Sequence, residues 1–592
     1  MNNPFSQRPV LKRFNAFVQA LFALMLLVAS TAYADTVLDP EVTTAVTQHQ
    51  AVYADQAMVV TANPHASEAA LAMLTAGGSA VDAAIAAQFV LTLVEPQSSG
   101  IGGGAFMLLY DQEQQQLLTF DGRETAPAAA KADRFLNDEG KPKRWIDALV
   151  GGQSVGVPGV VAMMAQAHER DGKLPWAKLI EPAIKLAENG FEVSPRLAGL
   201  LAKRYNPGLV KLEPAASYFY PDGEPLQAGQ LLKNPQLAAT MRIIAKHGSE
   251  AFYQGKLAEQ LVSAVQQAAI NPGDLTITDL AGYQPKRRAP LCAGYHQYQV
   301  CSMAPPSSGG IAVAQLMKLL EARDMSDLAT GSVGAVHQFA QASRLAFADR
   351  NRYIGDPDFV KVPVNELLAD SYIAERRQLI KANKDMGKAQ AGHVMSAPRA
   401  AGVSPELPST SHLSIVDGEG NAVSMTTSIE MAFGSGLMVN GFLLNNQLTD
   451  FSFSPSRDGT LVPNAVAAGK RPRSSMAPVM VFDQAGELEL VVGSPGGSRI
   501  INYVAQTLIA VLDGKLDIQQ AINMAKVTHR NDYLALEKGG WPQQTVEQLE
   551  SMGYELQQRD LNSGLHGIQK VKQGWLGGAD PRREGVALGL SK

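Results

Sequence analysis

The chain has 592 residues, of which 46% are hydrophobic and 18% are charged. This length exceeds the size at which a single hydrophobic core stops growing, so we expect two domains or one large layered domain. Glycine and proline occur at near-average frequency, which excludes a collagen-like or largely disordered protein.

The first 34 residues form a separate segment. Three basic residues precede an apolar run over 20–29, and Ala32-Tyr33-Ala34 has the spacing of an A-x-A cleavage site. This pattern predicts a signal peptide at 1–34 and export to the periplasm, with release into the medium as the alternative destination. An uncleaved membrane anchor is the other interpretation, but ten apolar residues are too few to span a bilayer.

The charge balance limits the partners of the exported chain. Without the first 34 residues it carries 48 Lys and Arg against 56 Asp and Glu, a formal charge of −8. Because nucleic acid is itself strongly negative, this charge argues against a nucleic-acid partner.

The hydrophobic pattern predicts buried helices followed by a hairpin. Two alanine-rich runs, 63–78 and 79–96, are apolar nearly all round, and Ser79 with Asp82 forms a capping-box pair at the start of the second. The β-prone runs 105–110 and 116–120 then flank a polar turn, and helices dominate over 158–266.

The second half of the chain is predicted to be rich in strands. Residues 381–408 lack an apolar period and indicate a long exposed loop. A helix is expected over 501–512, and strands are expected at 412–417, 421–427, 441–446, 478–483 and 488–494. These elements favour an α+β fold with antiparallel hairpins over a doubly wound parallel sheet.

The two cysteines, Cys292 and Cys301, lie in a short predicted hairpin that turns near His296 and Gln297. They would face each other across the two strands, so a disulfide fits both the register and an oxidising compartment. The turn lacks the usual Asn-Gly or Asp-Gly, and two free thiols remain equally open. Their spacing matches neither a metal site nor a redox motif.

Two glycine motifs resemble functional signatures but stand in the wrong context. The cluster 100–105 matches GxGxxA, but it follows a predicted helix and precedes a strand, so we expect a tight turn. Residues 152–156 match GxSxG without the strand before or the helix directly after the serine. The ten histidines show no metal-ligand spacing, so no metal site is predicted, and His412 is expected to be a partly buried structural residue.

Thr410 stands where the long polar loop meets the first predicted strand of the second half. A threonine hydroxyl needs a nearby base to act as a nucleophile, and the free α-amine of an N-terminal threonine is one such base. An α-amine has an ordinary pKa of about 7.7 to 8.0 and can accept a proton near neutral pH. This chemistry requires cleavage between Ser409 and Thr410; without it, the threonine simply begins a strand.

The sequence resembles the γ-glutamyltransferase family of N-terminal nucleophile hydrolases over nearly the whole mature chain. The resemblance is carried by ten motifs in the family's order: NPHASEAALAMLTAGGSAVDAAIA (63–86), SSGIGGGAFML (98–108), FDGRETAP (120–127), PPSSGGIA (305–312), TSHLSIVDGEGNAVSMT (410–426), FGSG (433–436), LLNNQLTDFS (443–452), KRPRSSMAP (470–478), GSPGGSRI (493–500) and ADPRR (579–583). The resemblance implies a four-layer αββα sandwich formed by two interwoven subunits, a large one at 35–409 and a small catalytic one at 410–592.

The resemblance also implies roles for single residues. Thr410 would be the nucleophile of both self-cleavage and acyl transfer, and Ser428 would support it with a second hydroxyl. The backbone N–H groups of Gly496 and Gly497 would form the oxyanion hole, where the lack of a Cβ allows close approach.

An amino-acid receptor is implied beside the nucleophile. Arg123 would hold the α-carboxylate of a γ-glutamyl group, together with Ser474 and Ser475. The α-ammonium would be held by a carboxylate and amide set consisting of Glu430, Gln447 and Asp450.

Two positions depart from the family pattern. Some members carry Asn in place of Glu430, and a carboxylate there should hold an ammonium at least as well. The seventeen residues between Ser452 and Lys470 make a shorter lid than in some members and lack their covering tyrosine. We therefore expect a more open pocket that admits larger γ-glutamyl compounds.

The function that the resemblance implies is γ-glutamyltransferase and glutathione hydrolase activity, with transfer to water or to an acceptor amino acid or peptide. No cofactor is required, because nucleophile, base and oxyanion donors all come from the chain. One alternative is an amidase for another dicarboxylic acyl group, such as glutaryl, which Glu430 and Asp450 disfavour because that group has no ammonium. The other alternative is an inactive, uncleaved binding protein.

Overall fold

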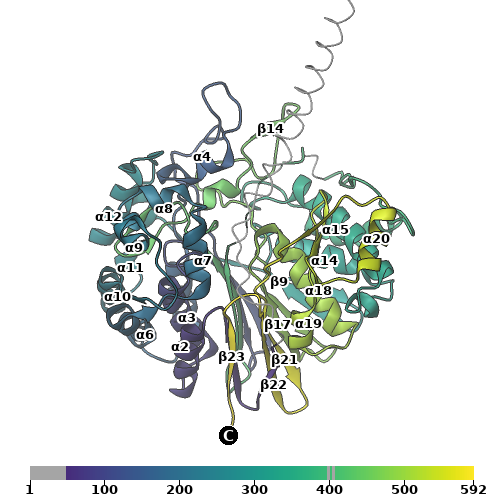
Figure 1. The fold of residues 1–592 in the computed structure, drawn as a ribbon, viewed down its shortest axis with the longest axis horizontal. Helices are drawn as coiled ribbons and strands as arrows, with labels where there is room; N and C mark the ends of the chain where they lie inside the picture. The colour runs from purple at the N-terminus through teal and green to yellow at the C-terminus, as the bar shows by residue number, and fades with distance from the viewer. Residues whose placement is uncertain (1–48, 397–399, 403, 405–406, 408) are drawn as a thin grey trace, which may run out of the picture. The chain divides into compact units, whose positions relative to one another are not determined.

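Two seven-stranded antiparallel sheets lie face to face at the centre of the fold (Figure 1). The first contains, in spatial order, β23 (Val586–Leu590), β2 (Ala57–Thr61), β10 (Ser411–Val416), β11 (Ala422–Ser428), β3 (Gly104–Asp111), β4 (Gln116–Gly122) and β7 (Lys286–Arg288). The second contains β1 (Val52–Ala54), β22 (Gly574–Ala579), β21 (His566–Val571), β17 (Leu488–Gly493), β16 (Val479–Phe482), β9 (Tyr298–Ser302) and β8 (Leu291–Tyr295).

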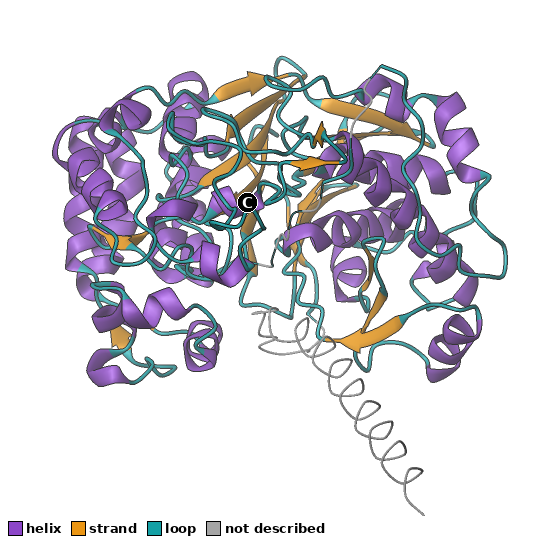
Figure 2. Ribbon diagram, turned by 90° about the horizontal axis from the view of Figure 1, so that it is seen from above, coloured by secondary structure: helices purple, strands orange, loops and turns teal. Residues whose placement is uncertain are grey.

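A layer of helices covers the outer face of each sheet (Figures 1 and 2). The first sheet packs against α2 (Pro64–Thr75), α3 (Ala80–Val94) and α5 (Val160–Asp171), and the second against α14 (Gly309–Leu320), α18 (Ile500–Leu512) and α19 (Ile518–Asn523). The architecture is therefore a four-layer αββα sandwich, which confirms the predicted α+β class.

The structure is a computed structural model that describes residues 49–396, 400–402, 404, 407 and 409–592. The predicted signal peptide lies outside these residues. All described residues belong to one unit, Glu41–Lys592, so the large layered domain is found rather than two domains. Within the described part, no helix combines the length and hydrophobicity needed to cross a bilayer.

The remaining elements extend the two helical layers or form small peripheral sheets. The helices are α4 (Trp145–Leu149), α6 (Trp176–Asn189), α7 (Pro195–Lys203), α8 (Pro207–Lys211), α9 (Ala215–Phe219), α10 (Pro235–His247), α11 (Glu250–Tyr253), α12 (Gly255–Gln266), α13 (Ile277–Ala281), α15 (Val333–Tyr353), α16 (Val364–Leu368), α17 (Asp370–Arg377) and α20 (Gln543–Ser551). The small strands are β5 (Phe191–Glu192), β6 (Leu231–Leu232), β12 (Met438–Val439), β13 (Phe442–Leu443), β14 (Ser456–Arg457), β15 (Thr460–Leu461), β18 (Val527–His529), β19 (Leu534–Glu537) and β20 (Leu556–Arg559).

Helix α3 leads the chain to the site. Its start is fixed by the predicted capping box, because the Ser79 side chain accepts from the Asp82 N–H and the Asp82 carboxylate accepts from the Ser79 N–H. Every residue of the helix is buried, as its all-round apolar sequence predicts. The glycine cluster that follows forms a turn into β3, so the GxGxxA match has no phosphate-binding context.

The GxSxG match is also structural. Residues 152–154 form a short 3₁₀ helix, and α5 begins only at Val160. The Ser154 hydroxyl donates to the carbonyls of Leu149 and Gly151, at 2.6 and 3.0 Å. A serine committed to two backbone acceptors closes a turn and has no role as a nucleophile here.

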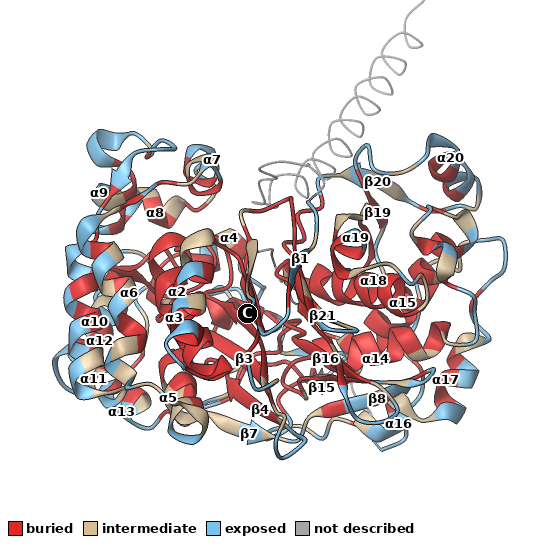
Figure 3. Ribbon diagram, turned by 90° about the horizontal axis from the view of Figure 1, so that it is seen from below, coloured by how far each residue is buried: buried red, intermediate tan, exposed pale blue. Residues whose placement is uncertain are grey.

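Strand β10 is buried on both faces, as Figure 3 shows for the centre of the sandwich. Its His412 ring lies between the sheets, 6.4 Å from the parallel ring of His566, and a Cβ on Gly493 would approach it to 2.3 Å. The prediction of partial burial was wrong, since His412 is fully buried. Burial holds the pKa of His412 well below its usual range, so the ring is a neutral structural element.

Most predicted elements of the second half are present. Helix α18 and strands β10, β11, β16 and β17 match the predictions, and the described part of 381–408 contains neither helix nor strand. The expected strand at 441–446 was wrong in extent, because only Phe442 and Leu443 pair, with β12. The next residues leave the ladder to donate and accept side-chain hydrogen bonds near the site.

Cys292 and Cys301 face each other in β8 and β9 and form a disulfide. This resolves the alternative that the sequence left open. Strand β8 is the edge of its sheet, so the bridge fastens an edge that has a hydrogen-bonded neighbour on one side only.

Replacing both cysteines by serine is expected to destabilise the protein by about 2–3 kcal/mol, because the bridge restricts a short loop in the unfolded chain. The measurement is the urea midpoint of unfolding. Reductant should shift the wild-type midpoint to the same value and leave the double variant unchanged. An identical midpoint for wild type and variant would contradict a role in stability.

Candidate active site

Thr410 lies directly before β10, an interior strand of its sheet with β2 on one side and β11 on the other. It is 3% exposed, and its hydroxyl donates to the carbonyl of Ser409 and lies 3.2 Å from the Ser428 Oγ. The Ser428 hydroxyl also lies 3.2 Å from the same carbonyl and accepts from the Glu430 N–H at 2.8 Å. Two hydroxyl groups thus converge on the peptide bond that joins Ser409 to Thr410.

The Thr410 side chain opens onto a small polar pocket. Its lining consists of Arg123, Thr410, Ser428, Glu430, Gln447, Asp450, Ser474, Ser475, Met476, Gly497 and Ile500. Every predicted site residue except Gly496 is therefore brought together, and the structure adds the apolar Met476 and Ile500. The cavity volume in this intact chain is about 20 Å³, which is room for about one water molecule.

Arg123 and Asp450 meet inside this pocket. Arg123 follows β4, is 1% exposed, and donates its Nε to the Pro472 carbonyl at 3.2 Å and an Nη2 proton to the Arg473 carbonyl at 3.1 Å. The same Nη2 forms an ion pair with the Asp450 carboxylate. The predicted holder of a carboxylate and one predicted holder of an ammonium therefore neutralise each other in this structure.

Ser474 and Ser475 are held by the PPSSGG segment at the start of α14. The Ser308 N–H and hydroxyl both donate to the Ser474 carbonyl at 2.7 Å. Arg350 donates to the Ser475 hydroxyl at 2.8 Å and to the Ser308 hydroxyl at 2.8 Å. This framework fixes the Ser474 backbone and the Ser475 hydroxyl, and both serines line the pocket together with Arg123.

The Gly496–Gly497 pair joins β17 to α18 in a conformation that glycine favours. Their φ angles are 131° and 56°, and a Cβ on Gly496 would lie 2.7 Å from the Tyr503 ring. Gly497 lines the pocket. Both glycines are thus required by the local backbone, whatever their part in catalysis.

Glu430 has a backbone conformation that is rare for its residue type. Its φ is 78°, although it is not glycine, and it stands two residues after Ser428. Such angles persist where surrounding contacts enforce them, and they concentrate at functional sites. Nothing in the sequence near Glu430 predicts this angle.

Glu124 is a buried carboxyl group that the sequence analysis missed. It is 0% exposed, lies 3.6 Å from Arg123 Nη1, and neither carboxyl oxygen hydrogen-bonds to another residue of the described chain. Burial raises its pKa from 4.5 to about 8, against the lowering effect of Arg123. Glu124 is therefore predominantly protonated at neutral pH, and its position next to Arg123 in the FDGRETAP motif was the available signal.

Replacing Glu124 with Gln is expected to keep activity at pH 7 within about threefold of wild type, because an amide mimics a neutral carboxyl group. Since the folded pKa lies above the ordinary value, stability is full below pH 4.5 and declines as the pH rises toward 8. The variant should lose this decline, measured as urea midpoints between about pH 5 and 8.5. An equal decline in both proteins would show that folding does not raise the pKa of Glu124.

Charged side chains also lie on the other side of Thr410, away from the pocket. Arg583 Nη1 donates to the Thr410 carbonyl at 3.0 Å, and the Ser411 hydroxyl donates to Glu95 Oε2 at 2.7 Å. Arg583 and Glu95 are both buried. Arg583 lies in the ADPRR motif, but no role was predicted for it from the sequence, and none was predicted for Glu95.

The layered fold places this chain in the N-terminal nucleophile hydrolase class. A solved structure of a cephalosporin acylase from Bacillus halodurans superposes with a TM-score of 0.80 at 27% identity, covering 92% of this chain and 98% of that one. The class fits a sandwich of two sheets with a hydroxyl residue before a central strand.

Sequence comparison defines the family within this class. The model described as "Gamma-glutamyltranspeptidase" matches residues 66–590, and the chain belongs to that family. A glutathione hydrolase proenzyme of Escherichia coli strain K12 is 38% identical over 90% of this chain and 91% of its own length. An acylase ACY 1 proenzyme of Pseudomonas sp. strain SE83 is 35% identical over 90% of this chain and 93% of its own length.

Proposed function

We propose that this protein is a γ-glutamyltransferase and glutathione hydrolase whose nucleophile is Thr410. The observation that carries the proposal is one small buried pocket that combines a threonine hydroxyl, an arginine and two carboxylates. The α-amino-acid end of a γ-glutamyl group presents a carboxylate and an ammonium, which pair with these charges. The family relatives named glutathione hydrolase support the same substrate class.

The nucleophile first has to be released. In the intact chain the Thr410 hydroxyl contacts the carbonyl group of Ser409, which is the group that it would attack in an N-to-O acyl shift. The Thr410 Oγ would attack the Ser409 carbonyl carbon, the C–N bond would break, and water would hydrolyse the resulting ester. The products are a large piece ending at Ser409 and a small piece, 410–592, with a free α-amine on Thr410.

In the transfer reaction the α-amine takes the proton from the Thr410 hydroxyl, whose oxygen attacks the γ-carbonyl carbon of the substrate. The N–H groups of Gly496 and Gly497 stabilise the oxyanion, and Ser428 supports the nucleophile. The amide C–N bond then breaks, and the ammonium returns its proton to the leaving amine. Water or an acceptor amine attacks the γ-glutamyl ester in the same way and restores Thr410.

The test is denaturing electrophoresis of the purified protein with N-terminal sequencing of the smaller band. Two bands are expected, with the smaller one beginning at Thr410. They should remain together as a heterodimer under native conditions, because β10 and β11 of the small piece pair with β2 and β3 of the large piece. A single band would favour the inactive binding protein, and a different N-terminus would move the nucleophile.

The similarity to acylases supports one alternative function, removal of a glutaryl-type group. Such a group has the same length without the ammonium, so it would leave Glu430 and Asp450 with no cation from the substrate. Parallel assays of γ-glutamyl and glutaryl anilides distinguish the two functions. Faster turnover of the glutaryl compound would favour the acylase.

The segment between Ser452 and Lys470 bears on substrate size. Its hairpin of β14 and β15 is short and exposed, with Leu461 59% exposed. A lid of this size is expected to leave the mature pocket open to larger γ-glutamyl compounds. Turnover of glutathione without any turnover of γ-glutamyl polymers would contradict this expectation.

A further inference from the structure

Arg583 is a buried residue near the C-terminus that donates a hydrogen bond to the Thr410 carbonyl. It belongs to a turn that is held by several hydrogen bonds. Asp580 anchors the turn by accepting from the N–H groups of Gly564 and Leu565, at 2.9 and 3.0 Å, and from the Arg582 N–H at 3.0 Å. Burial raises the pKa of Asp580, but the charges of Arg582 and Lys526 and the hydrogen bonds that it accepts together outweigh burial and lower that pKa, so Asp580 is ionised at neutral pH.

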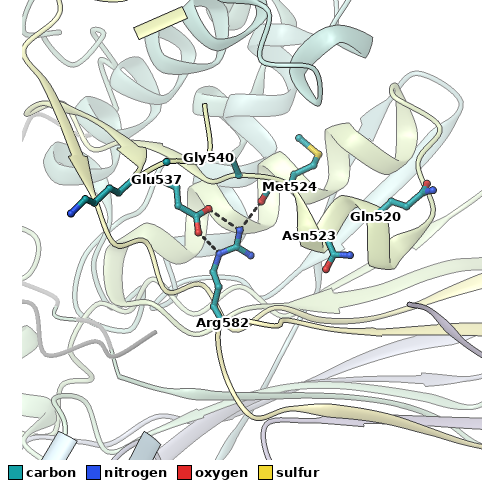
Figure 4. Close-up of a pocket in the computed structure, with 9 residues that line it drawn as sticks. Gln520, Asn523, Met524, Glu537, Gly540 and Arg582 are labelled. Carbon is teal, nitrogen blue, oxygen red and sulfur yellow. Dashed lines mark hydrogen bonds and ion pairs between the residues drawn. The ribbon is translucent and has the colours of Figure 1, made fainter. Parts of the chain in front are cut away.

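The two arginines of this turn make different contacts. Arg582 forms a two-pronged ion pair with Glu537, at 2.6 and 2.7 Å, and donates to the Met524 carbonyl (Figure 4). Arg583 instead donates Nη1 to the Thr410 carbonyl at 3.0 Å and Nε to the Asn562 Oδ1 at 3.1 Å. Arg582 is therefore a matched control, since it has the same charge and burial without a bond to Thr410.

The space for Arg583 is built into the backbone. A Cβ on Gly564 would lie 2.4 Å from the Arg583 Cδ, and the φ of Gly564 is 74°. Arg583 is 3% exposed. Both packing and hydrogen bonds thus fix the position of the Arg583 side chain. Its positive charge is therefore held at a fixed distance from Thr410.

Other charges also face the Thr410 main chain. Glu95 lies behind Ser411, with Arg196 Nε at 3.9 Å from its Oε1, and the Arg196 N–H donates to Glu584 at 2.7 Å. Burial raises the pKa of Glu95 and so favours its protonated form. The charges of Arg196 and Arg583 act in the opposite direction and favour the carboxylate. On the pocket side, Arg123 and Asp450 form an ion pair and Glu430 lies beside them.

We propose that Arg583 is a positioning residue that holds the Thr410 carbonyl and whose positive charge keeps the α-amine of cleaved Thr410 neutral and ready to accept a proton. The α-nitrogen is three covalent bonds from the carbonyl oxygen that Arg583 binds. A cation that close disfavours a second positive charge on the amine. The inference rests on the proposed function, because it needs Thr410 to be an N-terminus.

The size of the effect follows from Coulomb's law. A unit charge about 5 Å from the amine, with an effective dielectric constant of about 20 to 80, shifts its pKa by about 0.6 to 2.4. Loss of that charge would raise the pKa of the amine. The acid limb of the pH profile of kcat/KM would then move to higher pH, because protonated amine cannot act as a base.

The experiment compares four variants with wild type, using a γ-glutamyl anilide as the probe. Arg583→Gln removes the charge, and Arg583→Lys keeps it. Asn562→Asp retains an acceptor for Arg583 Nε while adding a neutralising carboxylate. Arg582→Lys is the control in the same turn.

The acid limb is expected to rise by about one pH unit in Arg583→Gln and in Asn562→Asp, and to stay within about 0.3 units of wild type in Arg583→Lys and Arg582→Lys. If Arg583→Gln does not self-cleave, the position of the acid limb in Asn562→Asp tests the proposal instead. A limb that stays at the wild-type position in a cleaved, active Asn562→Asp or Arg583→Gln enzyme would overturn the proposal, even if kcat falls. A wild-type protein that is uncut or inactive would instead overturn the proposed function.

Discussion

The Thr410→Ala variant is expected to remain a single uncut chain and to lose at least about 10⁴-fold in γ-glutamyl transfer activity. Alanine lacks the oxygen that would attack the Ser409 carbonyl, so the α-amine is never released. The same substitution removes the nucleophile of the transfer step. Fold and solubility should be preserved, because Thr410 precedes β10 and contributes no ladder pair.

Denaturing electrophoresis and a γ-glutamyl anilide assay measure the two effects separately. Thr410→Ser is the matched control, since it keeps both a hydroxyl and an N-terminal amine after cleavage, and it should mature with reduced but measurable activity. Cleavage of the alanine variant at the wild-type position would remove Thr410 from the self-processing step.

Arg123→Met is expected to lower kcat/KM for γ-glutamyl substrates by about 10²- to 10⁴-fold. Truncating one partner of a buried, hydrogen-bonded charge pair costs about 2–5 kcal/mol, and here the partner would be the substrate carboxylate. Asp450 would also lose the cation that now neutralises it. Self-cleavage should persist, because Arg123 makes no hydrogen bond to Ser409, Thr410 or Ser428.

Steady-state kinetics of the cleaved enzyme test this effect. Arg134→Met is a suitable control, because Arg134 is also buried and pairs with Asp274 at 2.7 Å but does not line the pocket. It should lower stability without changing kcat/KM. Similar kcat/KM losses in both variants would mean that Arg123 acts through stability and makes no direct contact with the substrate.

Elements with a strong local signal were predictable from sequence. Helix α3 has a capping box and an unbroken apolar run, and β10 and β11 flank a short polar turn. The site residues were assembled only because ten motifs matched a family. Taken one at a time, Arg123 follows a strand and Asp450 ends a 3₁₀ helix, and no local pattern places them in one pocket.

The features that sequence missed depend on long-range packing. The burial of Glu124 comes from the closeness of Gly104 and Gly156, whose added Cβ atoms would lie 2.6 and 2.9 Å from its side chain. The bond from Arg583 to Thr410 joins residues 173 positions apart. The strand expected at 441–446 was cut short because Asn445 bonds to the Gly102 and Gly156 carbonyls in place of a neighbouring strand.

The ion pair between Arg123 and Asp450 has a consequence for how substrate enters. A γ-glutamyl group brings one carboxylate and one ammonium, so its arrival would exchange an internal ion pair for two new pairs and leave the net charge of the pocket unchanged. The affinity for the substrate then depends on the difference in free energy between the internal ion pair and the pairs that the substrate forms. Because no net charge is transferred and both Arg123 and Asp450 are buried, KM should depend only weakly on ionic strength.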